Sequence, residues 1–595
     1  MRWSCSGQAS DLSLGWDGDT LRGNLNVENT GGRVLELCSP VVGETVEVNI
    51  LGDLNLSGGI LAVHSSEEGG AVVVVKHGGN VNISGGEFRL SGGSQGGTGM
   101  TVWELTSGNF NILDARISSS TTTLFGARFL FSKAGTRALS IGAGNTILAL
   151  PVDVSSGTTL SMGASELKGS GQFVLDSGAT LEIGHANGID GNIQTEGVKI
   201  LSKLANFTYN GSVSQVTGSL LPDTVNNLTL NNSLGLTLSK DVVVEGVMDV
   251  KRGSLVSGGK KLSYGSFGSL KYSGSVSQTT GGVEFPEVEG PKDLIIANSF
   301  GVTLHASRWI RGNLSLSGKL VLGSNTLTAG SVTTGSVTTM YVNTDGGGKL
   351  RLPVGSEEVL YPIGASGSST VSYCPVWIRN GGAVDTISVG AVKDTMYKST
   401  KPRITLKWEI SGSVGGDEYF VRFGWNPSST LHENSLFKAN RMDYARIFLV
   451  GGGDTLEAGS GDYVMQFSSS PYTVERGGIV ELGSFVVGRF KDSVWMAGVK
   501  EGGGSNSPCR YSLSQNYPNP FNAVTTIAYE VASAEQVTLI IYNTLGQEVA
   551  RLVNERKLAG RYEVRWDASN MPTGVYFYRL TAGKFISTKK LMLIK

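Results

Sequence analysis

Short runs in which apolar and polar residues alternate cover most of the chain, separated by Gly, Ser and Asn. The interval at 71–98, AVVVVKHGGNVNISGGEFRLSGGSQGGT, holds three such runs, around 73–75, 81–83 and 88–90. Alternation with a period of two is typical of β-strands, and no long helical periodicity competes with it. The pattern therefore predicts an all-β chain built from many short strands.

One five-residue motif returns at a nearly constant interval: GNLNV at 23–27, GDLNL at 52–56, GNVNI at 79–83 and GNFNI at 108–112. Three short strands in each interval predict one coil of a parallel β-helix. The apolar side chains of such a coil are buried only when the next coil stacks on it, at about 4.8 Å.

Each position of the motif has an expected place in the coil. The leading glycine is expected at a corner with positive φ, and the central asparagine in a hydrogen-bonded ladder or facing solvent. A calcium site is the less favoured alternative, because no GGxGxD repeat is present. The apolar positions predict the core residues Leu25, Val27, Leu54, Leu56, Val81 and Ile83.

A longer repeat follows, in which YNGSVSQVTG at 209–218 returns as YSGSVSQTTG at 272–281. Each copy, of about 65 residues, should supply two or more coils. GNLSL at 312–316 brings the first motif into this part of the chain. At roughly 27 residues per coil, residues 23–345 are predicted to form a right-handed parallel β-helix of about a dozen coils. Residues 1–22 are expected to be an irregular start.

Composition and charge narrow the class of protein. Gly occurs 84 times in 595 residues without a collagen triplet period. Lys plus Arg is 49 and Asp plus Glu is 50, and this net charge of −1 gives no electrostatic footprint for a nucleic-acid partner. No apolar run approaches the roughly 18 residues of a membrane helix. The four cysteines lie far apart without a CxxC, which argues against zinc and leaves a Cys5–Cys38 disulfide open.

From 346 to 498 the repeats stop and strand-length runs recur with turn signals between them, which predicts a β-sandwich-like region. This region carries Trp377, Trp408, Trp425 and Trp495. Exposed tryptophans can stack on sugar rings, but packing in a sandwich core is the favoured interpretation. A Gly/Ser linker is predicted at 499–508.

Alternation returns in the C-terminal segment at 509–595, with VTLIIY at 537–542 and GVYFYRL at 574–580. A turn at LGQ, 545–547, predicts a hairpin, and the spacing predicts about seven strands in a compact sandwich. The prolines of PNP, 518–520, fix an extended backbone before the first long strand. The terminal lysines can protect an edge strand from aggregation.

These segments, in this order, resemble the type A C-terminal sorting domain of substrates of the type IX secretion system, an immunoglobulin-like sandwich. The phrase VNNLTLNNSLGLTL at 225–238 resembles β-helical repeats of surface proteins exported by the same system. The sorting-signal positions that match the family's motifs are Pro518, Asn519, Pro520, Gly546, Gly560, Tyr562, Pro572, Gly574, Tyr576, Lys589, Lys590 and Lys595.

The resemblance implies export of a folded periplasmic protein across the outer membrane by the type IX translocation and sorting machinery. It also implies cleavage of the domain, with the body released or anchored to surface lipopolysaccharide. The expected location is therefore extracellular or on the cell surface. Such proteins first need a signal peptide, which MRWSCSGQAS does not supply, so an incomplete N-terminus is expected.

Catalytic chemistry has little support in the sequence. NTDG at 343–346 is similar to one polygalacturonase motif, but neither the Asp pair nor the Gly–His–Gly of that family follows it, so a turn is predicted. The five histidines lack metal-ligand spacing, and no cofactor or metal is expected. The favoured hypothesis is a non-enzymatic, adhesive or structural surface protein. The alternatives are a polysaccharide-binding or polysaccharide-degrading β-helix, with glycans as partners of its tryptophans, and a spacer for a catalytic domain upstream.

Overall fold

Residues at every second position of the recurring motif are buried in the computed structural model. The predicted core residues Leu25, Val27, Leu54, Leu56, Val81 and Ile83 are each 0–1% exposed. The structure describes residues 2–4, 12–13, 20–38, 43–64, 72–90, 100–113, 116–118, 127–142, 150–335, 339–365, 373–393, 403–412, 418–427, 433, 437–438, 445–451, 454–460, 462–488, 511–531, 534–558, 560–583 and 585–594. They fall into two units, Met1–Ala497 and Gly498–Lys595.

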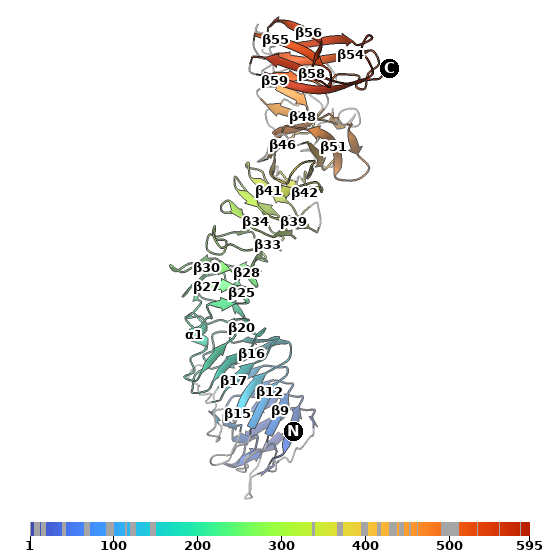
Figure 1. Ribbon diagram of the computed structural model, residues 1–595. Helices are drawn as coiled ribbons and strands as arrows, with labels where there is room; N and C mark the ends of the chain where they lie inside the picture. Colours follow the sequence, from blue (N-terminus) through green and yellow to red (C-terminus); the bar gives the residue numbers. More distant parts are fainter. Residues whose placement is uncertain are drawn as a thin grey trace. The chain divides into compact units, whose positions relative to one another are not determined.

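The first unit is a parallel β-solenoid of about 13 turns, followed by antiparallel sheets (Figure 1). Its longest sheet receives one strand from each pass of the chain. In order these strands are β1 (Arg2–Ser4), β4 (Leu25–Asn29), β7 (Leu54–Leu56), β10 (Val81–Ile83), β13 (Phe110–Ile112), β16 (Gly135–Ile141), β18 (Thr158–Ser161), β20 (Thr180–Ile183), β22 (Asn206–Tyr209), β25 (Asn227–Asn231), β28 (Val247–Arg252), β31 (Ser269–Tyr272), β33 (Asp293–Ile296), β36 (Asn313–Leu316) and β39 (Ser331–Thr334).

The other faces of the early coils are two parallel sheets. One contains β14 (Arg116–Ser118), β11 (Glu87–Arg89), β8 (Ile60–Ala62), β5 (Val34–Glu36) and β2 (Leu12–Ser13). The other contains β21 (Lys199–Leu201), β19 (Phe173–Leu175), β17 (Val152–Val154), β15 (Ala127–Phe131), β12 (Met100–Leu105), β9 (Val72–His77), β6 (Thr45–Ile50) and β3 (Thr20–Leu21). A short helix, α1 (Ile189–Asn192), marks the change to the later coils.

The later coils have shorter side faces. These sheets are β23 (Gln215–Val216), β26 (Leu236–Thr237) and β29 (Leu255–Val256); β24 (Thr224–Val225), β27 (Val242–Val244) and β30 (Leu262–Tyr264); and β32 (Gln278–Thr279), β34 (Val302–Thr303), β37 (Leu320–Val321), β40 (Val342–Asn343) and β43 (Ile363–Gly364). Parallel pairing thus runs from β1 to β43, beyond the expected limits 23 and 345 at both ends.

Coil length changes along the solenoid. In the early coils, hydrogen bonds between equivalent asparagines join positions separated by 29, 27 and 29 in the sequence. In the later coils, the bonds from Val247 N to Asn227 and from Asn313 N to Asp293 span a separation of only 20. The expected coil length is therefore wrong for the later part. The cause is strand length, because β9 and β12 have six residues each and β24 has two.

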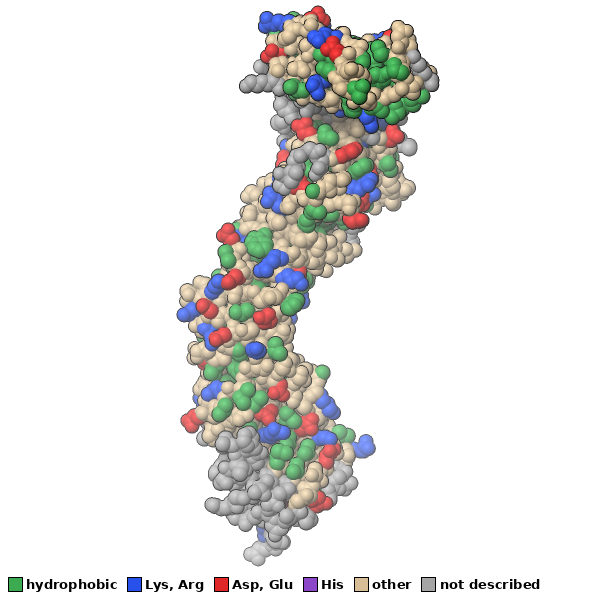
Figure 2. All heavy atoms as spheres, viewed as in Figure 1, with side chains coloured by type: hydrophobic (Ala, Val, Ile, Leu, Met, Phe, Trp, Pro, Cys, Tyr) green, Lys and Arg blue, Asp and Glu red, His purple; other side chains and the backbone are tan. Residues whose placement is uncertain are grey.

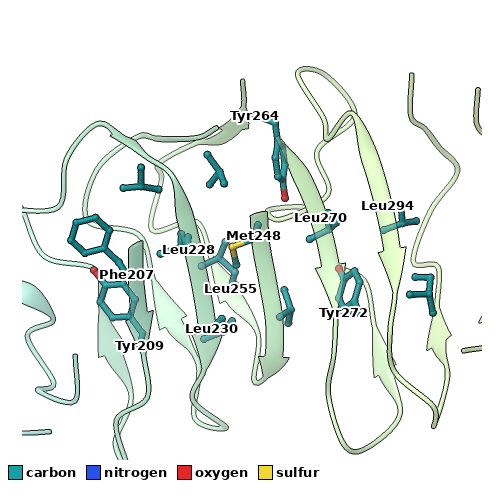
Figure 3. Close-up of a cluster of buried hydrophobic side chains, with 14 of the residues drawn as sticks. Phe207, Tyr209, Leu228, Leu230, Met248, Leu255, Tyr264, Leu270, Tyr272 and Leu294 are labelled. Atoms are coloured by element: carbon teal, nitrogen blue, oxygen red, sulfur yellow. The ribbon is translucent and has the colours of Figure 1, made fainter. Parts of the chain in front are cut away.

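The longer repeat corresponds to three short coils. Tyr209 ends β22 and Tyr272 ends β31, with β25 and β28 between them. Both rings are fully buried in the cluster of Figure 3, and their hydroxyls donate to Thr217 O at 2.6 Å and to a Glu284 carboxylate oxygen at 3.0 Å. The repeat therefore places one large, internally bonded aromatic ring every third coil.

The glycine of the motif is required by the close approach of two backbones. A Cβ on Gly52 would overlap the backbone of Gly23, and a Cβ on Gly79 would overlap that of Gly52. Neither Gly52 nor Gly79 has positive φ, although Gly108 does. Positive φ, the expected reason, applies among the four copies to Gly108 alone, where a Cβ would also overlap the backbone of Gly79. Coil-on-coil contact therefore accounts for Gly52, Gly79 and Gly108, whereas a Cβ on Gly23 would meet no atom within 4 Å.

The central asparagines form the expected ladder. Asn55 Nδ2 donates to Asn26 Oδ1 at 2.7 Å, and Asn82 Nδ2 donates to Asn55 Oδ1 at 2.8 Å. Asn111 Nδ2 continues the ladder to Asn82 Oδ1 at 2.8 Å. Each internal amide thus donates to one neighbouring coil and accepts from the other, which fixes the register between coils.

A second row of polar side chains holds the corner beside the ladder. Asn24 Oδ1 accepts the Asp53 N–H at 2.9 Å, and Asp53 Oδ1 accepts the Asn80 N–H at 2.7 Å. In the later coils Asp293 Oδ1 accepts the Asn313 N–H at 2.6 Å. These bonds satisfy backbone donors at a bend where the sheet cannot reach them.

Antiparallel sheets cover the end of the solenoid core. β41 (Lys349–Val354) pairs parallel with β38 (Thr326–Thr328) and antiparallel with β45 (Asp385–Lys393). The sheet order is β35 (Arg308–Trp309), β38, β41, β45, β46 (Leu406–Ser411), β52 (Ser484–Gly488), β48 (Arg446–Gly451) and β49 (Asp454–Glu457). The facing sheet is β42 (Val359–Tyr361), β44 (Val376–Asn380), β47 (Tyr419–Trp425), β51 (Tyr472–Ile479) and β50 (Val464–Gln466). One continuous hydrophobic core spans the coils and these sheets.

The second unit is a seven-stranded antiparallel sandwich with its own core, as the alternation predicted. One sheet is β53 (Ser512–Leu513), β54 (Val524–Val531) and β57 (Gly560–Asp567). The other is β56 (Glu548–Lys557), β55 (Glu535–Tyr542), β58 (Gly574–Ala582) and β59 (Phe585–Leu593), in that order, so β59 lies at an edge.

The substitution Asn55→Asp tests the asparagine ladder. It removes the amide that donates to Asn26 and places a carboxylate oxygen against the Asn26 oxygen. We expect urea unfolding at pH 7 to show a loss of about 1–3 kcal/mol in the free energy of unfolding. Asn26→Asp is the matched control, because within the ladder Asn26 only accepts. Equal losses in the two variants would show that the ladder contributes nothing.

A second prediction concerns pH. His77 lies between Ile50 and Leu105 in a buried row, stacks on Trp103 with ring centroids 5.5 Å apart, and has a pKa that burial lowers to about 4. An unfolded histidine binds a proton near pH 6.5. The contribution of neutral His77 to the free energy of unfolding is therefore complete above pH 6.5, and it is lost as the pH falls from about 6.5 to about 4.

His77→Leu should remove this loss. We expect urea unfolding to show that the stability difference between pH 7 and pH 5 is about 2 kcal/mol smaller in the variant than in the parent chain. An unchanged pH dependence would mean that the folded state also binds the proton on His77.

Candidate functional site

The predicted sorting residues belong to the second unit, and the structure brings the first and the last of their motifs together. Phe521 pairs in parallel with the end of β59: its N–H donates to Met592 O at 2.9 Å, and the Ile594 N–H donates to Phe521 O at 2.9 Å. The loop that contains Pro518, Asn519 and Pro520 therefore lies along the free edge of the last strand. We call residues 515–521 and β59 the composite edge.

Side chains of the loop complete this attachment. Asn519 Oδ1 accepts the Met592 N–H at 2.8 Å, and Gln515 Nε2 donates to Lys590 O at 2.7 Å. Together with Phe521, these bonds use the outward backbone groups of β59 from Lys590 to Ile594. An edge strand with unpaired groups can pair with other chains, and here this half of the edge is covered.

The loop conformation is held from inside. Pro518 O accepts hydrogen bonds from Thr525 Oγ1 at 2.9 Å and from Asn516 Nδ2 at 3.1 Å. The Tyr578 hydroxyl donates to Ser514 O at 2.7 Å and accepts the Asn516 N–H at 2.9 Å. Burial raises the pKa of Tyr578 to about 12, so the phenol keeps the proton that it donates.

The two described terminal lysines have different surroundings. Lys590 is exposed and lies opposite Phe577, on the outer face of the four-stranded sheet. Lys589 lies opposite Tyr578 and is partly buried, on the same face of β59 as the core residue Leu591. Lys595, the third predicted lysine, lies outside the described residues.

The hairpin turn has the geometry that its sequence predicts. Gly546 has φ of 78°, and a Cβ there would meet no atom. Glycine is therefore favoured by the positive φ of the backbone and not by a lack of space. Asn543 closes the turn, because its Oδ1 accepts the N–H groups of Leu545 and Gln547 at 3.0 Å. Leu545, at the tip, is 81% exposed.

Gly560 and Tyr562 lie at the far end of the three-stranded sheet. Gly560 begins β57 opposite Val531. The Tyr562 ring stacks on Tyr529 with centroids 5.4 Å apart, and its hydroxyl donates to Leu558 O at 2.8 Å. The register places this pair at the opposite end of β54 from the composite edge.

Gly574 and Tyr576 lie at the start of β58 beside the composite edge, and Pro572 precedes the strand. Gly574 lies opposite Leu593, the same residue that Phe521 meets. Tyr576 is 4% exposed, and its hydroxyl donates to Pro572 O at 2.8 Å. The structure therefore gathers PNP, Pro572, Gly574 and the end of β59 at one end of the sandwich, away from Gly560 and Tyr562.

The outer face of the four-stranded sheet combines apolar and cationic side chains. Tyr542, Phe577 and Lys590 lie side by side in one row across three strands. The Arg579 guanidinium lies 5.4 Å from the Tyr542 ring centroid, and Ile586 is 64% exposed. Such a face can bind another protein through apolar contact and through its positive charges.

Sequence reasoning missed several residues that hold the composite edge: Gln515, Asn516, Phe521 and Tyr578. Tyr578 could have been found as a polar ring at a core position of the alternating run GVYFYRL. The side-chain amides of this loop could not have been found from the sequence pattern. Their partners include backbone groups of β59, which lies far away along the chain.

The other candidate chemistry is dispersed. In NTDG, Asn343 Oδ1 accepts the Asp345 N–H at 2.9 Å in a turn. Trp408 and Trp425 are fully buried, with their ring N–H groups donating to Cys374 O and to a Glu433 carboxylate oxygen. Trp495, His432 and Cys5 lie outside the described residues.

The described residues also contain no metal-ligand cluster and no membrane-spanning helix. In these parts of the chain no three His, Cys, Asp or Glu side chains converge as they would around a metal ion. Within the same residues, no helix has the length and apolar character needed to cross a bilayer. On the face shown in Figure 2, basic and acidic side chains are interspersed along the body.

Comparison with known proteins identifies the second unit. Residues 515–595 match the family described as the secretion system C-terminal sorting domain. This part of the chain is a type IX secretion C-terminal sorting domain, preceded by a β-solenoid body. It indicates secretion across the outer membrane and interaction with the type IX machinery. Searches of curated proteins and of solved structures gave no match.

The bond between Asn519 and Met592 can be tested directly. Asn519→Ala removes the acceptor of the Met592 N–H, so this amide should exchange its hydrogen faster, and the free energy of unfolding of the second unit should fall by about 1 kcal/mol. Amide hydrogen exchange followed by NMR provides both readouts. Asn554→Ala, at an exposed side-chain pair with Gln536, is the control. Unchanged Met592 exchange would mean that the loop does not protect the edge.

Proposed function

We propose that the chain is a non-enzymatic surface or secreted protein, adhesive or structural in role, whose solenoid body is delivered by its sorting domain. The observation that carries the proposal is the joining of two units with separate cores: a stacked repeat body and a type IX sorting domain. A secretion domain with its own hydrophobic core can fold without contributing to the core of the body that it exports.

The body supports an adhesive or structural role through its regularity. Successive coils present outward side chains at the strand spacing of about 4.8 Å. The asparagine ladder and the corner bonds keep these side chains in register over several coils. A repeated surface of this kind binds extended partners through many weak contacts, as other solenoids do.

We further propose that the machinery recognises the composite edge together with the exposed Lys590. The loop that contains PNP and the strand segment that contains Lys590, which stand far apart in the sequence, are joined there by hydrogen bonds. Lys595, Gly560 and Tyr562 are proposed to act in the same signal, Gly560 and Tyr562 by fixing the sandwich at its other end. After export, the body is released or anchored to surface lipopolysaccharide.

The adhesive role is tested with beads. Beads coated with the purified full chain should be retained several-fold more under flow over a bacterial film than beads coated with the second unit alone, which has its own core. The reason is that only the full chain presents the repeated coil surface. Equal retention of the two kinds of beads would overturn the adhesive role.

A further inference from the structure

Two exposed aromatic rings on the solenoid carry cations above them. Phe267 is 74% exposed, and Lys292 Nζ lies 5.4 Å from its ring centroid. Trp309 is 47% exposed, and the Arg311 guanidinium carbon lies 5.7 Å from its ring centroid. Large apolar rings on a surface leave apolar area in water, so two such rings within three consecutive coils need an explanation.

Backbone bonds place these four residues on three consecutive coils. The Lys292 N–H donates to Gly268 O at 2.7 Å, and the Gly312 N–H donates to Lys292 O at 2.9 Å. Phe267 precedes Gly268, and Arg311 precedes Gly312, so they occupy the same corner one coil to either side of Lys292. We call Phe267, Lys292, Trp309 and Arg311 the aromatic–cation ridge.

The cations of the ridge differ from two nearby lysines, Lys261 and Lys271. Lys261 forms an ion pair with Glu289 at 2.5 Å, and Lys271 with Asp249 at 3.5 Å. Within the described part of the chain, neither Lys292 nor Arg311 has a carboxylate oxygen within ion-pair distance. Their charges are therefore available to an anionic group from outside.

A further cation extends the ridge along the same face. Trp309 pairs with Thr328, and Thr328 pairs with Arg351 on the next coil. The Arg351 side chain is exposed, and its Nε donates to Ser388 Oγ at 2.8 Å, which holds the guanidinium against the sheet. Positive charge thus recurs along the stacking direction on both sides of the Trp309 ring.

We propose that the aromatic–cation ridge binds an anionic polysaccharide. The C–H faces of sugar rings would pack on Trp309 and Phe267, while the carboxylate, sulfate or phosphate groups of the same chain contact Lys292 and Arg311. A linear polymer laid across the coils meets the ring and charge positions in succession. The inference rests on the proposed adhesive role and names the class of ligand.

A nucleic acid is the less suitable anion. Its binding depends on neutralising many phosphates with a large basic patch, whereas this chain has a net charge of −1 and the ridge holds two cations beside two rings. At Trp309 a single apolar ring lies beside a single cation, Arg311. This combination suits a sugar ring that bears one acidic group, because the ring can contact the tryptophan while the acidic group contacts the arginine.

The test measures binding of the purified full chain to defined polymers by biolayer interferometry. The probes are polygalacturonate, dextran sulfate, neutral dextran and a single-stranded oligonucleotide. We expect binding to one or both acidic polysaccharides and none to neutral dextran. Trp309→Ala should raise the dissociation constant about tenfold, and Lys292→Gln with Arg311→Gln should also flatten its dependence on salt.

Phe300→Ala and Lys203→Gln are matched controls, since Phe300 is 61% exposed in the turn between β33 and β34, and Lys203 is exposed in the turn between β21 and β22, and neither belongs to the ridge. Both should bind like the parent chain. Parent-like binding by the Trp309 and double variants would overturn the inference. So would binding of the oligonucleotide with equal affinity and equal sensitivity to these variants, because the ridge would then be a general anion surface.

The same variants separate this inference from the proposed adhesive role. If beads coated with the parent chain adhere and beads coated with Trp309→Ala adhere equally well, adhesion stands and the ridge is not its site. If beads coated with the parent chain do not adhere although the chain binds acidic polysaccharide in solution, the ridge stands and the adhesive role fails.

Discussion

Each coil of the body depends on the coils before and after it, because its apolar side chains are buried only between them. The rows Leu25–Leu54–Val81 and Leu228–Met248–Leu270 are almost fully buried for this reason. Stacking at the strand spacing leaves no room for a Cβ where the corners meet, which accounts for Gly52 and Gly79. It also brings equivalent asparagines within hydrogen-bond distance of one another.

A stack of this kind must end without exposing its core. At one end the core is covered through β41, because this strand pairs in parallel with the last coils on one side and antiparallel with β45 on the other. The core then runs on into the sandwich-like region, where Trp408 and Trp425 fill it. The second unit meets a related problem at the edge strand β59, and its own 515–521 loop covers half of that edge.

Most of the architecture could be predicted from the sequence, because period-two alternation and a recurring motif report directly on strands and coils. The core residues of the motif and the seven-stranded second unit were predicted and are confirmed. For the asparagines two arrangements were expected, a ladder or exposure to solvent, and the structure shows the ladder. Coil length in the later part was not predicted correctly. The longer repeat, which runs from Tyr209 to Tyr272, can hold three coils as readily as two. The number of coils in one repeat follows from how the strands pair and not from the length of the repeat.

The sites were predicted less completely. Pro518 to Pro520 and the terminal lysines were identified from a resemblance. The bonds that join Gln515 to Lys590 O and Asn519 to the Met592 N–H depend on folding that brings distant segments together. Of the tryptophans singled out in the sequence, Trp408 and Trp425 are fully buried and Trp377 is half-buried, whereas Trp309 is exposed. The segment RWIRG at 308–312 offered a signal, because its alternation puts the tryptophan on the outer face between two arginines.

Export through the sorting domain is the central claim, and surface exposure on intact cells tests it most directly. The full chain would be expressed behind a signal peptide in a type IX-competent bacterium, and protease would be added to intact cells. The account predicts that the solenoid body is digested or found in the medium, and that it stays protected in the periplasm when residues 515–595 are deleted. A body that reaches the surface equally well without those residues would contradict the account.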